Sequence, residues 1–251
     1  MTQAAHPGSH RPRPGGGRGG ASRSRTHGGP TRRAARPSRW PFAVVAAVVV
    51  LAGVVAIAVS RGGGGGSSAA TAYETAPVTI TGAPLAPVPA DATGLLDPAT
   101  DPAVGQPVPV LSGVSFDGSP VTVGTPGQPT VVAFVAHWCP HCQKEVPLLQ
   151  QWRRDGSLPS TVQWATVSTS VEPDGPNYPP SAWLARVGWT APVMADSADS
   201  QAAQTWGLSS FPYLVAVRAD GTVAARGVGE LTLDQVRTLV AAAAGPGATS
   251  P

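Results

Sequence analysis

The sequence predicts an α/β domain, with helices on both faces of a mixed sheet, at residues 104–244 of the 251-residue chain. Three observations carry this prediction. Strand-like and helix-like segments alternate through the region, the last two strands meet at a hairpin signal at Asp220-Gly221, and a wholly apolar strand lies near the beginning. Such a strand is typical of the centre of a sheet that is covered on both faces.

The chain begins with a basic region followed by an apolar one. Residues 1–39 contain nine arginines among Gly, Pro and Ser and no acidic residue, so we expect a disordered, cytoplasmic basic tail. Residues 40–60 are predicted to form a membrane anchor. They include the uncharged run from Phe42 to Val59, whose eighteen residues approach the roughly 20 that a membrane-spanning helix needs.

A cleaved signal peptide is the alternative for this apolar run, because Ala56–Ala58 fits a small-x-small cleavage pattern. The run is longer than the roughly 7–15 residues of a signal-peptide core, which favours a retained anchor. Nine arginines precede the run and only Arg61 closely follows it, which places the N-terminus in the cytoplasm. Both interpretations export the predicted domain, either anchored to the cell membrane by residues 42–59 or secreted.

The charge after the anchor is acidic. Residues 62–251 hold seven basic and all fourteen acidic residues, a net charge of −7. Because phosphate binding relies on clustered Lys and Arg, we expect no nucleic-acid partner for the domain. Residues 61–103, rich in Gly, Pro and Ala and without a sustained period, are predicted to be a flexible linker, and residues 245–251 a flexible tail.

The elements of the domain follow from residue periodicity and end signals. We expect strands at 121–123, 130–136 and 162–168, helices at 143–152, 179–188 and 200–207, two strands within 211–229, and a last helix at 232–244. Pro140 suits the first turn of the helix after the apolar strand, and Thr232 is expected to cap the last helix. Trp183, Trp189 and Trp206 are expected in the core.

The segment His137–Cys142 ("HWCPHC") holds both cysteines of the chain, at the point where the apolar strand ends and a helix begins. Two cysteines separated by two residues in a first helical turn lie within disulfide distance. The unpaired N–H groups of the helix stabilise a thiolate on Cys139, and a protonated His141 lowers the pKa of that thiol further. An inert structural disulfide is the weaker interpretation, because so short a loop is a poor staple.

With these residues the chain resembles the thioredoxin superfamily. "FVAHWCPHC" is similar to the strand, tryptophan and CxxC of that superfamily, and Pro147 matches the proline of its active-site helix. "SSFPYLV" resembles the segment that carries its cis-proline, here Pro212 after Phe211. The resemblance implies a thioredoxin fold and a redox-active Cys139–Cys142 pair, in which Cys139 attacks and Cys142 resolves.

Two groups within the superfamily are similar to this chain. The Pro140-His141 dipeptide resembles the oxidising DsbA type. Glu145, Pro147 and the N-terminal anchor look more like the TlpA/ResA group of tethered thiol-disulfide oxidoreductases. The resemblance implies a monomer that exchanges disulfides with proteins outside the cytoplasm and needs neither an organic cofactor nor a metal. Its catalytic residues would be Cys139, Cys142 and Pro212, supported by Trp138, Pro140, His141, Phe211 and Glu145.

One position departs from the thioredoxin pattern. Where thioredoxin has a buried aspartate, this chain has Ala133, so another group must take the proton from Cys142. Glu145 is the candidate by proximity, and a solvated helix residue is the alternative interpretation of that glutamate. His137 is expected at the surface.

Two further functions stay open at this stage. His137, Cys139, His141 and Cys142 are potential ligands of zinc or copper(I), which would make the chain a metal-binding protein or metallochaperone; Met194 is the other soft ligand of the domain. A peroxiredoxin-like peroxidase is the third possibility, although Ala136 stands where that class has threonine or serine.

Overall fold

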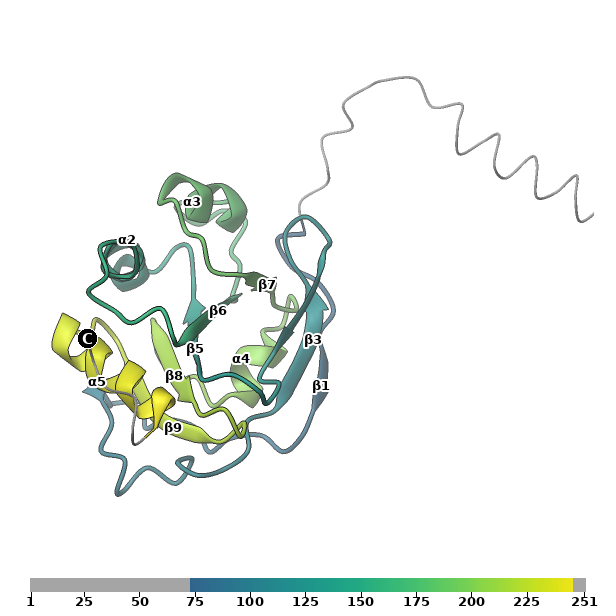
Figure 1. The fold of residues 1–251 in the computed structure, drawn as a ribbon. Coiled ribbons are helices and arrows are strands. Elements are labelled where there is room, and N and C mark those ends of the chain that lie inside the picture. The colour runs from purple at the N-terminus through teal and green to yellow at the C-terminus, as the bar shows by residue number, and fades with distance from the viewer. Residues whose placement is uncertain (1–72, 246–251) are drawn as a thin grey trace, which may run out of the picture. The chain divides into compact units, whose positions relative to one another are not determined.

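A six-stranded sheet forms the centre of the computed structural model, which describes residues 73–245 (Figure 1). Its strand order is β2-β9-β8-β5-β6-β7, and a smaller sheet has the order β1-β3-β4. The strands are β1 (Thr79–Thr81), β2 (Gly94–Leu95), β3 (Val110–Val114), β4 (Pro120–Val123), β5 (Thr130–Val135), β6 (Gln163–Ser168), β7 (Val193–Ala195), β8 (Tyr213–Val217) and β9 (Val223–Val228). The helices are α2 (Pro140–Arg154), α3 (Pro180–Arg186), α4 (Gln201–Thr205) and α5 (Leu233–Ala244).

The large sheet is mixed, as the sequence predicts. β5 runs parallel to β6 and antiparallel to β8, so it lies in the interior of the sheet. Its residues from Val131 to Val135 are all buried, which explains its uninterrupted apolar sequence. Helix α2 begins after four intervening residues, at Pro140, so the centre of the sheet fixes the position of the CxxC at the start of this helix.

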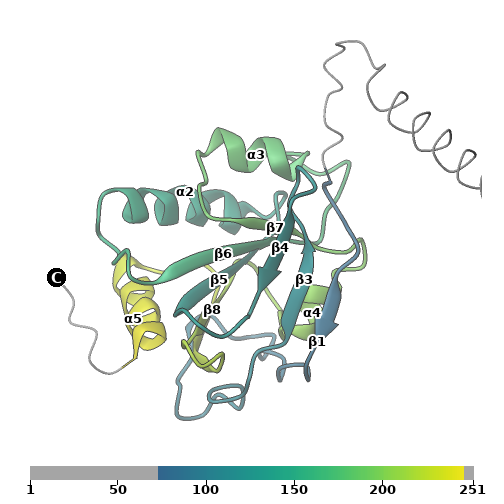
Figure 2. The same ribbon diagram turned by 45° about the vertical axis from the view of Figure 1, so that its right-hand side comes forward.

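Two separate apolar cores lie on the two faces of this sheet. On one face α2 and α5 pack through Val146, Leu149 and Leu239 against the side chains of Val131 and Val135. On the other face α4 and the small sheet pack against Val132, Phe134 and Val215. Figure 1 shows α2 and α5 on one side of the strands and α4 on the other, and Figure 2 shows β3 and β4 on the side of α4. The predicted α/β architecture with helices on both faces is confirmed.

The predicted strands and helices of the domain are present with small differences at their ends, and two strands were missed. β3 has Ser112 and Gly113 in its interior, which break the apolar alternation; a Cβ on Gly113 would lie 3.4 Å from the side chain of Met194. β7 has only three residues and follows a proline, so it carries little strand signal. Thr232 caps α5 in a capping box with Gln235, as predicted.

The linker predicted for residues 61–103 is wrong for its described part. β1 pairs with β3, and β2 pairs with the edge of β9. Between these strands and beyond, residues 83–103 form a strap that runs along the domain, with Leu85, Val88 and Ala103 buried. The N–H groups of Leu85 and Val88 donate to carbonyls at the end of α4. The strap is mostly neither helix nor strand, so its contacts to distant residues leave no period in the sequence.

A buried ion pair joins this strap to the large sheet. Arg226 of β9 is fully buried and forms an ion pair with Asp101, whose side chain is 1% exposed. The Arg226 guanidinium also donates to the Ala86 carbonyl (2.7 Å) and to the Tyr213 hydroxyl (3.2 Å). The strap is therefore anchored at two points by a single side chain of the sheet.

The membrane anchor predicted for residues 42–59 and the basic tail before it lie outside the described residues. Within residues 73–245 none of the helices is long and apolar enough to cross a membrane.

Candidate active site

The CxxC lies at the start of α2, where Cys139 is the N-cap residue and Pro140 occupies the first turn. No side chain caps this helix, so its first N–H groups are available to the Cys139 sulfur. Pro140 has no N–H, and the first donors are those of His141 and Cys142. The local sequence thus places a cysteine where an anion is stabilised by the helix terminus.

Cys139 is the more acidic of the two thiols. The pKa of Cys139 is lowered to about 5. The largest cause is the hydrogen bond from the Cys142 thiol, and smaller ones are the N–H groups of Cys142 and His141 and the charge of His141. Burial opposes this shift. Both cysteines are free in this structure, and the side chain of Cys139 is 6% exposed. At neutral pH Cys139 is therefore mainly a thiolate, although only a small part of the residue is exposed.

Cys142 has the opposite character. Its side chain has no exposed surface. This burial raises the pKa of the Cys142 thiol far above its usual range, and the hydrogen bond to Cys139 adds a smaller increase. The N–H of Ala136 lies 3.5 Å from the Cys142 sulfur. One member of the pair is therefore ionised and slightly exposed, whereas the other is protonated and fully enclosed.

Glu145 lies one helical turn after Cys142 and is 1% exposed, so the alternative of a solvated helix residue is wrong. Its Oε2 accepts a hydrogen bond from the N–H of Leu231 (3.3 Å), and its Oε1 has no partner within the described residues. Burial raises the pKa of Glu145 to about 7. The Ala133 position on β5 carries no titratable group, which leaves Glu145 as the carboxyl beside Cys142.

His141 faces an acidic residue that the sequence analysis missed. Its Nδ1 lies 2.6 Å from Oε1 of Glu230, which follows β9, and the Lys144 ammonium lies 3.2 Å from the same oxygen. All three side chains are at least 40% exposed, so this is a surface cluster. Glu230 is 89 residues from His141 in the chain, and only the antiparallel return of β9 brings the two together.

His137 is fully buried, so the expected surface position is wrong. Its Nε2 accepts a hydrogen bond from the N–H of Glu172 (3.1 Å), and its Nδ1 lies 2.8 Å from the carbonyl oxygen of Pro176. Because a carbonyl can only accept, Nδ1 carries the proton and donates it. Both ring nitrogens hold the loop of residues 170–179 beside the CxxC, and neither is free to bind a metal.

A groove of about 520 Å³ opens beside Cys139. Trp138 and Phe211 meet edge to face on it, with ring centroids 5.8 Å apart, and the indole N–H of Trp138 donates to the Ser170 carbonyl (2.6 Å). The peptide bond between Phe211 and Pro212 is cis, as the resemblance implies. Pro212 itself is buried and its carbonyl accepts from the N–H of Gly229 (2.8 Å), so Phe211 rather than Pro212 lines the groove.

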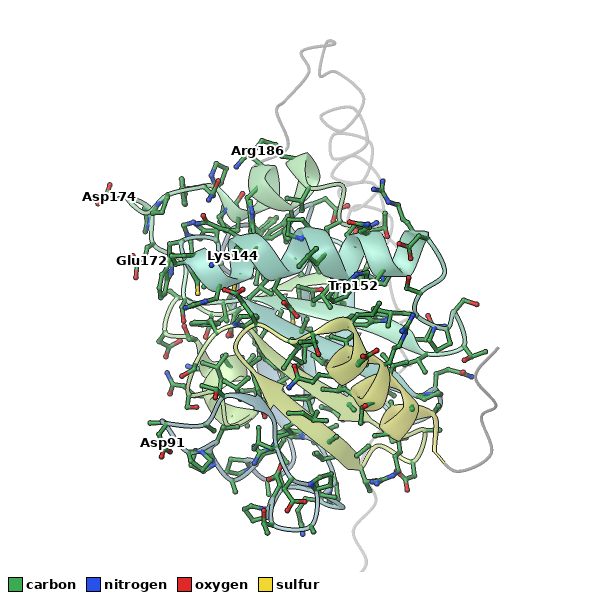
Figure 3. All side chains as sticks on the ribbon, turned by 90° about the vertical axis from the view of Figure 1, so that its left-hand side faces the viewer. Asp91, Lys144, Trp152, Glu172, Asp174 and Arg186 are labelled. Carbon is green, nitrogen blue, oxygen red and sulfur yellow. The ribbon has the colours of Figure 1, made fainter. Side chains whose placement is uncertain are left out.

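The strap forms the opposite wall of this groove. Ala90, Ala92, Thr93 and Gly94 line it together with Glu230. Figure 3 shows Asp91 of the strap and Glu172 and Asp174 of the 170–179 loop at the end of the molecule where α2 begins.

The potential metal ligands do not converge in the part of the chain that the structure describes. Residues 73–245 contain no group of three or more His, Cys, Asp or Glu side chains placed to hold a metal ion. Met194 belongs to the core on the α4 face of the sheet, whereas both cysteines belong to the core on the α2 face. The metal-binding alternative gains no support from this arrangement.

Residues 103–242 match the protein family described as Redoxin. The chain belongs to the Redoxin family. This membership confirms the resemblance to the thioredoxin superfamily and the class of thioredoxin-like oxidoreductase that the CxxC and cis-proline segments indicate. The tryptophans predicted for the core of this redoxin domain are Trp183 and Trp206, both buried, and Trp189, which is half-buried against it.

Among individual proteins, one relative is similar over a short segment, and solved structures are similar over a longer part of this redoxin chain at low sequence identity. The methylamine utilization protein MauD of Methylobacillus flagellatus is 42% identical over 52 residues, which cover 20% of this chain and 25% of MauD. The aligned segment thus spans about a quarter of that relative. A putative thiol:disulfide interchange protein DsbE from Chlorobium tepidum has 21% identity and a TM-score of 0.46, covering 57% of this chain and 98% of its own. A DsbF homologue from Corynebacterium diphtheriae has 18% identity and a TM-score of 0.48, with coverages of 63% and 98%.

The charge of His141 should tune the redox potential of this redoxin. We expect His141→Ala to raise the pKa of Cys139, because one of the contributions that lower it is removed. A rise of about one in the pKa corresponds to ~1.4 kcal/mol and makes the potential ~30 mV more negative. The pH dependence of Cys139 alkylation and equilibration with a glutathione buffer measure the two quantities.

Lys144→Ala is the matched control, because Lys144 contacts the same Glu230 carboxylate but does not act on the Cys139 thiol. The alkylation midpoint of this variant should stay near pH 5. An unchanged potential in His141→Ala, or an equal change in both variants, would show that His141 does not stabilise the thiolate.

Proposed function

We propose that this protein exchanges a disulfide between its Cys139–Cys142 pair and thiols of other proteins. The observation that carries the proposal is the difference between the two cysteines. Cys139 opens onto a groove and has a pKa of about 5, whereas Cys142 is enclosed and its pKa is strongly raised. The attacking cysteine must be ionised and accessible, and the resolving cysteine acts only after the mixed disulfide has formed.

The exchange has two steps in the reducing direction. The Cys139 thiolate attacks one sulfur of the partner's disulfide, and the second partner sulfur leaves as a thiolate with the electron pair of the broken S–S bond. Cys142 then loses its proton and attacks the Cys139 sulfur, which releases the first partner sulfur as a thiolate. The partner has gained two electrons, and the protein holds the Cys139–Cys142 disulfide. The reverse order oxidises a partner dithiol.

Glu145 takes the proton from Cys142 in this proposal. Its pKa of about 7 means that a carboxylate and a carboxylic acid are both populated near neutral pH, which suits a group that accepts and returns a proton. Leu231 donates to Oε2 and leaves Oε1 without a partner in the described residues. A buried oxygen without a hydrogen-bond partner is costly, and a role in proton transfer would explain why this one is retained beside the Cys142 thiol.

The partner lies in the groove as an extended segment between the strap and Phe211. Trp138 and Phe211 offer it apolar surface, and the backbone preceding the cis-proline offers it hydrogen bonds. The pair serves as the redox group, so neither an organic cofactor nor a metal takes part, and the protein acts as a monomer. We infer a comparatively oxidising potential, above that of thioredoxin, because a stabilised thiolate favours the reduced form.

The location belongs to the same proposal. The uncharged run of residues 42–59 would hold the domain at the outer face of the cytoplasmic membrane, with the arginine-rich tail inside. A cleaved signal peptide would instead release the same domain. The partners are therefore proteins outside the cytoplasm in both cases.

Capture of mixed disulfides tests the exchange and the roles of the cysteines. In Cys142→Ser the nucleophile remains but nothing resolves the intermediate, so partner proteins should accumulate on Cys139 in non-reducing gels and be released by reductant. Cys139→Ser should capture essentially none, because its remaining thiol is buried and protonated.

Each variant replaces a single sulfur by oxygen, at positions three residues apart, so the two variants control for each other in expression and folding. Equal capture by both would contradict the assigned roles. Capture by neither variant, in cells where both are exported and folded, would contradict protein disulfide exchange itself.

A further inference from the structure

A second pocket lies at the opposite end of α2, away from the cysteines. It encloses about 270 Å³ between the last turn of α2, the loop before β6 and the residues that precede β7. Its lining includes Arg153, Leu158, Ser160, Trp164, Thr190 and Pro192. Arg153 is the one charged side chain among the described residues that line this pocket.

The charge of Arg153 has no carboxylate partner within the described residues. The ion pairs of this region are made by other residues, since Arg237 pairs with Asp234 on α5. The nearby Asp155 carboxylate instead accepts the N–H of Ser157 (2.9 Å). Arg153 is partly buried, and this burial lowers the pKa of its guanidinium. A partly dehydrated cation without a counter-charge is costly, and an anion would relieve that cost.

The donors of Arg153 are divided between the protein and the solvent. Nη1 donates to Oε1 of Gln150 (3.0 Å) and lies 3.4 Å from the Thr190 hydroxyl. Gln150 is 1% exposed and also accepts from the N–H of Thr190 (3.3 Å), so Nη1 is fixed by a buried amide. Nε and Nη2 donate to no residue of the described chain. These two atoms form one of the parallel pairs of donors with which a guanidinium binds a carboxylate.

Two tryptophans hold the guanidinium in place. Its central carbon lies 5.7 Å from the ring centroid of Trp164 and 5.1 Å from that of Trp189. The indole N–H of Trp189 is itself held by the Thr166 hydroxyl (2.9 Å). Cation–π contacts to the rings restrict the flexible side chain, so that its unused donors are oriented before a ligand binds.

We propose that this pocket binds a small carboxylate, with Arg153 as the residue that recognises it. The side-on pair of Nε and Nη2 holds the two carboxylate oxygens, and Leu158 and Pro192 contact a short apolar body. A single guanidinium matches a single negative charge, whereas a phosphate dianion would leave one charge unpaired in a domain whose net charge is already negative. The site is separate from the CxxC and does not depend on the exchange reaction proposed above.

Titration of the full chain with sodium butyrate, at constant ionic strength set with sodium chloride, tests this site. Because Trp164 and Trp189 lie beside Arg153, binding should produce a saturable change in tryptophan fluorescence and raise the midpoint of thermal unfolding. In Arg153→Gln, which keeps a polar side chain beside Gln150, the affinity should be at least ~10-fold lower, as expected for lost hydrogen bonds to a charged group.

Arg154→Gln is the matched control. Arg154 is the exposed neighbour of Arg153, carries the same charge and does not line the pocket, so this variant should bind butyrate as the unaltered chain does. A fluorescence change that does not saturate, or equal binding by Arg153→Gln, would overturn the site. Tighter binding of inorganic phosphate than of butyrate would overturn its assignment to carboxylates.

Discussion

Replacing Asp101 by asparagine should lower the free energy of unfolding by about 3–5 kcal/mol, because it leaves the Arg226 charge buried without its partner. The guanidinium is fully buried between the strap and β9, and it has no access to water that could replace the carboxylate. The remaining contacts of Arg226, to the Ala86 carbonyl and the Tyr213 hydroxyl, are to uncharged groups. Urea unfolding followed by tryptophan fluorescence measures the difference.

Two further measurements show whether the loss of stability in Asp101→Asn comes from the buried, unpaired charge of Arg226. Asp234→Asn breaks the pair with Arg237, whose side chains are 91% and 49% exposed, and should cost less than about 1 kcal/mol. Asp101→Leu combined with Arg226→Met removes both buried charges and should recover most of the loss, since apolar replacement of a whole pair is often neutral. A loss below about 1 kcal/mol in Asp101→Asn would mean that the pair is not the link between strap and sheet.

The same pair should also affect the groove, because the strap forms one of its walls. Arg226 holds Ala86 and Asp101 on either side of the segment that places Ala90, Ala92 and Gly94 beside Cys139. The stability of the domain and the shape of the groove are thus expected to depend on a residue that does not itself line the groove.

The sequence predicted what depends on neighbouring residues. The CxxC, the first-turn proline and the apolar β5 lie within a dozen residues of one another, so this short stretch of sequence is enough to predict a strand, a helix start and a cysteine pair between them. The structure confirms the sheet, the helices and the cis-proline segment that follow from such patterns.

What the sequence analysis missed depends on residues far apart in the chain. Glu230 contacts His141, which lies 89 residues earlier in the chain. Arg226 likewise forms its ion pair with Asp101, 125 residues earlier. The burial of His137 follows from two hydrogen bonds to the 170–179 loop, although histidine next to a CxxC suggests an exposed position. The prolines of the strap and its lack of a regular period favour a flexible tether. An extended segment that packs on the domain has no period either, so the sequence pattern does not distinguish the two.

Glu145→Gln should slow the resolution of the mixed disulfide by roughly 10²-fold at neutral pH, the lower end of what a positioned general base contributes. Cys142 cannot attack while it is protonated, and burial holds its pKa far above neutral, so a nearby acceptor must remove the proton in the same step. Glu145 accepts it only as a carboxylate. Because its pKa is about 7, the rate of the unaltered protein should rise as the pH increases through 7. Glutamine cannot ionise, so this rise should disappear.

Stability measurements distinguish this role from a structural one. The pKa of Glu145 is raised in the folded state, so the stability that its neutral form contributes is present at low pH and is lost as the pH rises through about 7. Glutamine avoids this loss, and Glu145→Gln should therefore be at least as stable as the unaltered protein at pH 8 while reacting more slowly. Rapid-mixing measurements on mixed disulfides of Cys139 with a model thiol give the rates. Resolution that is equally fast in both proteins would remove Glu145 from the proton transfer, because its neutral substitute would then serve as well.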